Sequence, residues 1–125
     1  MSIPPLRILI LEDEPLILME MSFAIEDEGA RAAGAHTVAR ALAAIAEMRP
    51  DAAILDVNLG RGTTCEPVAE RLKELGVPFL LHSGDLVRQG ELIARIDAEV
   101  IPKPAPSNQV AERVLAIAVP RPGTA

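Results

Sequence analysis

Short apolar runs alternate with helix-like segments along the sequence, and this alternation constrains the fold more than any other feature. Most of the runs are brief and rich in Ile, Leu and Val, and they are bounded by Gly, Pro or charged residues, which is typical of strands buried on both faces of a sheet. The run at residues 31–36 is the weakest strand prediction, because it is poor in β-branched residues. Strands that alternate with helices form right-handed βαβ units, so we expect a parallel sheet with helices on both faces. The predicted strands lie at residues 6–11, 31–36, 52–55, 77–82 and 98–101.

Proline and glycine residues mark the ends of the predicted helices. Pro15 and Pro67 suit the first turn of a helix, whereas Gly29 and Gly76 suit the position just past a helix end. Thr37 is a predicted N-cap. The predicted helices span residues 15–28, 38–49, 67–75 and 86–96, and a last helix follows a cap at Ser107 or Asn108. This pattern favours an α/β fold, a flavodoxin-like (βα)5 sandwich of three layers with strand order 2-1-3-4-5.

Composition narrows the class of protein. The length predicts one domain over residues 1–125, with a core at about 6–118 and a frayed tail at 119–125. With 18 acidic against 12 basic residues, the net negative charge disfavours contact with phosphates, and with only 2% aromatic residues few side chains could stack on bases, so nucleic acid is not an expected partner. No apolar run reaches the roughly 20 residues that span a bilayer, and the N-terminus has no signal-peptide pattern. The single cysteine, Cys65, fits a reducing cytoplasm.

Polar residues that follow the apolar runs are the strongest indication of function. Glu12 and Asp13 follow the first run, Asp56 the third, Ser83 the fourth and Lys103 the fifth. Because parallel strands end at the same edge of a sheet, these side chains should meet there, where ligands of open α/β sheets bind. Each signal alone is typical of a helix N-terminus or a turn. Their occurrence together at successive strand ends indicates a site.

The expected site has the residues for phosphoryl transfer. Three carboxylates in one crevice repel one another, and a hard divalent cation such as Mg²⁺ relieves the repulsion. The predicted metal ligands are Glu12, Asp13, Asp56 and Asn58, the last through its backbone carbonyl. A carboxylate beside Mg²⁺ is also a nucleophile toward phosphorus. Asp56 is the predicted phosphoryl acceptor, with Lys103 and the Ser83 hydroxyl stabilising the phosphoryl oxygens.

In order and spacing these residues resemble the receiver domain of bacterial two-component response regulators, over essentially the whole chain. The resemblance implies a stand-alone phosphoacceptor, and not an enzyme acting on other molecules. Its donor would be a phosphohistidine on a sensor histidine kinase or a histidine phosphotransfer protein. Output would pass to a downstream protein through the face built from the fourth helix, fifth strand and fifth helix, from a monomer or a phosphorylation-dependent homodimer. A cis Lys103–Pro104 peptide bond is also implied.

The chain departs from the receiver pattern at its switch. Val100 replaces the aromatic residue three positions before the lysine, and Ser83 stands where threonine is commoner. Residues 78–84 partly resemble a subgroup of single-domain receivers whose fourth strand runs Pro-Phe-x-Phe-Ala-Thr-Gly-Tyr. We therefore expect phosphoryl acceptance to be retained and the mode of output to differ.

Two other functions fit parts of the pattern. An Asp-dependent phosphohydrolase uses a similar sheet with an Asp-x-Asp pair, but this chain has Glu12-Asp13 after its first strand and Asn58 two residues after Asp56. A pseudo-receiver that serves only as a binding scaffold stays open because of Val100. The remaining reactive side chains are predicted to be inert. His36 and His82 are expected at a core edge or in loops, and Cys65, although near a helix start that could lower its pKa, has no evident base.

Overall fold

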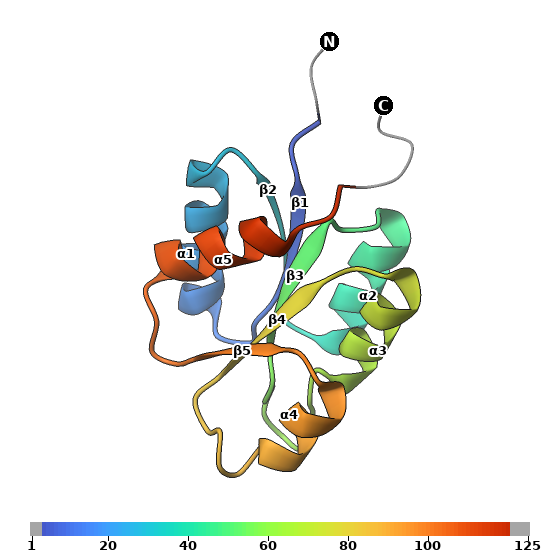
Figure 1. The fold of residues 1–125 in the computed structure, drawn as a ribbon, viewed down its shortest axis with the longest axis vertical. Helices are drawn as coiled ribbons and strands as arrows, with labels where there is room; N and C mark the ends of the chain where they lie inside the picture. The colour runs from blue at the N-terminus through green and yellow to red at the C-terminus, as the bar shows by residue number, and fades with distance from the viewer. Residues whose placement is uncertain (1–3, 121–125) are drawn as a thin grey trace.

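The structure, a computed structural model, describes residues 4–120 and contains a five-stranded parallel sheet (Figure 1). The strands are β1 (Arg7–Leu11), β2 (Arg31–Ala35), β3 (Ala52–Asp56), β4 (Phe79–Ser83) and β5 (Glu99–Pro102). Their spatial order is β2-β1-β3-β4-β5, and each neighbouring pair is parallel. The predicted flavodoxin-like arrangement is therefore confirmed.

Helices cover both faces of the sheet. On one face lie α1 (Pro15–Asp27) and α5 (Ser107–Ile117), and on the other lie α2 (Val38–Glu47), α3 (Glu66–Leu75) and α4 (Gly90–Ile96) (Figure 1). Because strand side chains alternate between faces, Leu9 and Leu55 pack with α2 and α3, whereas Ile8 and Ile54 pack with α1 and α5. Two apolar cores result, one on each side of the sheet.

The strands differ in burial from the centre of the sheet to its edge. Every residue of β3 is buried, whereas the edge strand β5 has no fully buried residue. The registers place Asp56 opposite His82 and Ser83 opposite Pro102, and the Lys103 N–H donates to the Ser83 carbonyl at 2.9 Å. The carboxyl ends of β1, β3, β4 and β5 therefore meet at one edge, as the sequence predicts.

Several predicted helix ends are confirmed. The Thr37 hydroxyl accepts a hydrogen bond from the Arg40 N–H at 3.1 Å and caps α2. Gly29 and Gly76 follow α1 and α3 with φ values of 85° and 70°, a left-handed conformation that glycine adopts without strain. Both α1 and α3 carry a proline in the first turn.

The predicted start of the fourth helix is wrong. Residues 86–89 form a turn, and α4 begins only at Gly90. The Asp85 carboxylate accepts a hydrogen bond from the Arg88 N–H at 2.9 Å, and the Asp85 carbonyl accepts one from the Gln89 N–H at 3.1 Å. Aspartate competes with the helix for nearby N–H groups in this way, which explains the late start.

The predicted caps of the last helix are also wrong. The residue at the cap position is Pro106, with φ −59° and ψ 137°, and no side chain there accepts a hydrogen bond. Because the extended Pro106 directly precedes the helix, Ser107 is already its first residue and neither Ser107 nor Asn108 serves as the cap.

Both ends of the sequence extend beyond the described residues. The Val119 N–H donates to the Asp51 carbonyl at 3.0 Å, so the first residue of the predicted frayed tail is bonded to the body of the domain. Residues 121–125 of that tail lie outside the described residues, as do residues 1–3. Between residues 4 and 120, no helix is both long and apolar enough to cross a membrane.

Candidate functional site

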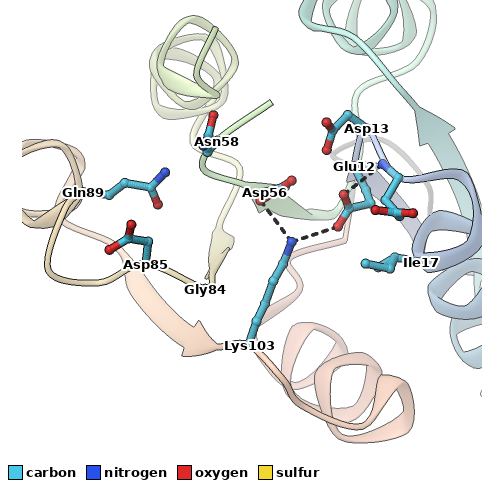
Figure 2. A pocket seen from close by; sticks show the side chains of 10 residues that line it. Glu12, Asp13, Ile17, Asp56, Asn58, Gly84, Asp85, Gln89 and Lys103 are labelled. Carbon is cyan, nitrogen blue, oxygen red and sulfur yellow. Dashed lines mark hydrogen bonds and ion pairs between the residues drawn. The ribbon is translucent and has the colours of Figure 1, made fainter. Parts of the chain in front are cut away.

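Acidic and basic side chains from three strand ends meet in one pocket of about 270 Å³ (Figure 2). Glu12 follows β1, Asp56 ends β3, and both are buried, whereas Lys103 follows β5 and keeps a quarter of its side chain exposed. The Lys103 ammonium donates to Glu12 Oε1 at 3.3 Å and to Asp56 Oδ1 at 3.2 Å. The ammonium therefore bridges the two buried carboxylates. The Lys103–Pro104 peptide bond is cis, as the resemblance implies.

Asp13 completes an acidic group of the kind that holds a cation. One carboxylate oxygen from each of Glu12, Asp13 and Asp56 lies within 4.8 Å of the others, and Asp13 is exposed, so the group opens to solvent. Asn58 lines the same pocket, and its side-chain oxygen accepts the Gly60 N–H at 3.0 Å. The Asn58 side chain thus stabilises the local turn, and its backbone carbonyl is the group that it could offer to a cation. Oxygen donors of this kind fit a hard cation such as Mg²⁺.

Burial and repulsion perturb the charges of the pocket. The pKa of Asp56 is raised from 3.8 to about 7, first by burial and then by the Glu12 carboxylate, against the opposing effect of Lys103. Burial alone would lower the pKa of Lys103, but the Asp56 and Glu12 carboxylates outweigh it and the pKa is raised. The ionised form of Asp56 therefore depends on positive charge beside it, which Lys103 supplies and a bound cation would increase.

Comparison with known proteins identifies the family. Residues 8–114 match the response regulator receiver domain family. The chain belongs to that family. This receiver domain is 33% identical, over 92 residues, to the KDP operon transcriptional regulatory protein KdpE of Escherichia coli K12, an overlap that covers 74% of this chain and 40% of KdpE. The chain thus spans less than half the length of that regulator.

Solved receiver structures share the fold along nearly the whole chain. A CheY-like receiver domain protein from Methanospirillum hungatei JF-1 superposes with a TM-score of 0.78 at 23% identity, covering 90% of this chain and 92% of the other. SdrG from Sphingomonas melonis Fr1 superposes with a TM-score of 0.73 at 38% identity, covering 94% of this chain and 98% of SdrG.

Ser83 ends β4, as predicted, but its hydroxyl is hydrogen-bonded to the segment before α4 and not to the acidic group. Ser83 is 1% exposed, its Oγ donates to Gln89 Oε1 at 2.5 Å, and it accepts the Asp85 N–H at 3.3 Å. Asp85 and Gln89 line the pocket on the side opposite Glu12 and Asp13 (Figure 2). The sequence reasoning missed both residues, although two polar side chains in the segment that follows the fourth strand were a usable signal.

The other singled-out side chains lie outside the cationic and acidic group. His82 is buried on β4, and neither ring nitrogen has a hydrogen-bond partner among residues 4–120. Burial and then the charge of Lys103 lower the pKa of His82 to about 4, so the imidazole is neutral. Cys65 is buried as well, and burial followed by the Asp56 charge raises the pKa of its thiol to about 12. The lowered pKa considered for Cys65 is therefore wrong, because the thiol is inside the core and not at an exposed helix start.

Proposed function

We propose that this receiver domain accepts a phosphoryl group on Asp56 from a phosphohistidine of a sensor histidine kinase or histidine phosphotransfer protein, in a Mg²⁺-dependent reaction. The observation that carries this proposal is the Lys103 ammonium held between Asp56 and Glu12, in a pocket that also contains Asp13. In the transfer, an Asp56 oxygen bonds to phosphorus and the P–N bond to the donor imidazole breaks. The electron pair of that bond leaves with the imidazole nitrogen, and Asp56 becomes an acyl phosphate.

The residues beside Asp56 have separate roles in this reaction. Lys103, already 3.2 Å from Asp56 Oδ1, would pair with a phosphoryl oxygen and stabilise its negative charge. The Ser83 hydroxyl would donate a hydrogen bond to a second phosphoryl oxygen. These groups lie on β4 and just after β5, so the phosphoryl group would link the centre of the sheet to its edge.

The acidic group fits Mg²⁺ by the chemistry of its donors, because it offers carboxylate oxygens close together with one side open to water. Glu12, Asp13 and Asp56 would hold the ion, with Asn58 contributing its backbone carbonyl. When bound, Mg²⁺ would offset the repulsion among the carboxylates and stabilise charge on the phosphoryl oxygens.

The donor is expected to approach over α1. Ile17, in the first turn of this helix, borders the pocket. The solvent side of the helix carries Leu16, Met19 and Phe23, which are 64%, 46% and 58% exposed. Residues 8–30 contain seven carboxylates and no basic side chain. A phosphodonor protein with an apolar surface flanked by Lys and Arg would complement both features. A cytoplasmic location is inferred from the lone cysteine, which fits a reducing compartment.

Phosphoryl acceptance is tested with a small donor. The native chain, incubated with acetyl phosphate and Mg²⁺, should gain the mass of one phosphoryl group, and the adduct should be labile to base. Asp56→Asn should gain none, and Asp51→Asn serves as a matched control because this buried aspartate lies at the opposite end of β3. An adduct that survives Asp56→Asn would contradict the proposal. Absence of any adduct would favour a binding scaffold, and continued turnover of a phosphate monoester would favour a hydrolase.

A further inference from the structure

The hydroxyl of Ser83 is already committed in this structure. It donates to the side-chain oxygen of Gln89, while the Asp85 N–H donates to it. A serine hydroxyl has one proton, so it can donate to one strong acceptor at a time. Phosphoryl oxygens on Asp56 would be acceptors only, so Ser83 can reach them only by giving up its donation to Gln89.

We propose that Gln89 is a positioning residue that holds Ser83 in its unphosphorylated orientation, and that phosphorylation of Asp56 releases Gln89 together with the start of α4. This inference rests on the proposed function and adds a mode of output to it. In receivers with an aromatic residue at the position of Val100, that side chain relays the signal. Val100 is an aliphatic residue in β5 and has no ring to move, so Gln89 would relay the signal in its place.

The placement of Gln89 couples this release to the chain around it. Gln89 is the residue directly before α4, its N–H donates to the Asp85 carbonyl at 3.1 Å, and its carbonyl accepts the Ile93 N–H at 2.9 Å. A movement of Gln89 must therefore move the turn at residues 85–89 and the first turn of the helix together. That turn carries Leu86 and Val87, which are 42% and 95% exposed and would change position on the surface.

The two ends of α4 are held differently. The far end is fixed to α3, because the Lys73 ammonium donates to the Ile96 carbonyl and the Arg95 guanidinium forms two hydrogen bonds with Glu66, at 2.6 and 3.1 Å. Ile96, at that end, is the buried residue of the helix. Near the start of α4, Leu92 and Ile93 are only partly buried against the core, and the side-chain hydrogen bond that ties this start to the sheet is the one between Gln89 and Ser83. Breaking this bond would loosen the start of the helix and leave its end in place.

The inference is tested by beryllofluoride binding in the presence of Mg²⁺, followed by amide NMR of the full chain. Gln89→Met keeps the length of the side chain and removes its strong acceptor, and Gln89→Ala is a second variant without one. Either variant should bind beryllofluoride about 2- to 10-fold more tightly than the native chain, since about one net hydrogen bond no longer has to be broken. Without beryllofluoride, the amide signals of residues 85–93 should already be shifted toward their positions in the loaded native chain.

The control is the same substitution in a Ser83→Ala background, where Gln89→Met should change the affinity by less than about 2-fold because the hydroxyl is absent. Unchanged or weaker binding by both Gln89 variants, with normal binding by the native chain, would overturn the inference and leave the proposed function standing. An equal gain in the Ser83→Ala background would also overturn it. If the native chain takes up no beryllofluoride, the proposed function falls and the inference falls with it.

Discussion

The two sides of the proposed phosphoacceptor pocket differ in how tightly they are packed. Glu12 and Asp56 end β1 and β3, whose apolar side chains are buried between two layers of helices. Gln89 and Lys103 flank α4 and β5, where α4 buries one residue and β5 buries none fully. The acidic side is thus fixed by the packed core. The side proposed to contact the phosphoryl group can change at little cost in buried area, because segments with few buried contacts open most easily.

The difference in packing between the two sides is tested most directly by shortening one leucine on each side. Leu55→Ala, in fully buried β3, should lower the free energy of unfolding by about 3 kcal/mol. Leu92→Ala, on half-buried α4, should lower it by about 1 kcal/mol. Urea unfolding followed by circular dichroism measures both, and equal losses would show that the two sides are packed alike.

Mg²⁺ should stabilise the acidic side by a comparable amount. At a concentration about 100-fold above its dissociation constant, the ion should raise the free energy of unfolding by about 3 kcal/mol, and chelation with EDTA should reverse the gain. Asp13→Asn should remove most of the effect, since it takes one carboxylate from the cation group. Asp27→Asn, at the exposed end of α1, is the matched control and should respond like the native chain. A full Mg²⁺ response in Asp13→Asn would place the ion elsewhere.

The cost of ionising Asp56 predicts a pH-dependent effect in metal-free protein. Its pKa is raised from 3.8 to about 7 in the folded chain, so the folded state resists ionisation and loses stability as the pH rises from 4 to 7. At pH 8 Asp56→Asn should therefore be more stable than the native chain by about 2 kcal/mol, roughly half the upper bound set by the shift, because the amide remains a buried polar group. At pH 4 the two should be equal. Destabilisation of Asp56→Asn at pH 8 would mean that its bond to Lys103 outweighs burial and repulsion.

The smallest effect is expected on the surface of the thinly packed side, in the turn before α4. Val87→Ser replaces a side chain that is 95% exposed and should change the free energy of unfolding by less than about 0.5 kcal/mol. The same substitution at the buried Val57, just after β3, should cost at least about 2 kcal/mol. A large loss at Val87 would show that the turn before α4 is packed more firmly than its exposure indicates.

The packed side is also the part of the molecule that the sequence predicts best. Buried strands are continuous apolar runs, and their boundaries agree with the structure within two residues. Strand order then brings Glu12, Asp13, Asp56 and Lys103 to one edge, so most of the site follows from topology. The cap at Thr37 and the glycine stops follow from local backbone chemistry that tertiary contacts do not override.

The thinly packed side could not be predicted to the same depth. The start of α4 depends on whether Asp85 bonds to the turn or the helix, a competition between nearly equal local hydrogen bonds. The bond between Ser83 and Gln89 follows from that turn, so it could not be foreseen once residues 86–89 were taken as helical. Cys65 shows a related limit, since its position beside a helix start did not indicate that its side chain is buried.

Pro102 has a consequence for the open edge of the sheet. The Lys103 N–H points toward β4, so by the alternation of a strand the nitrogen of Pro102 faces outward and its missing proton weakens no bond to β4. Of the four β5 residues, Val100 is left with the outward N–H. A second chain that tried to add a strand here would find half the usual donors, so the exposed border of the sheet is protected against edge-to-edge aggregation.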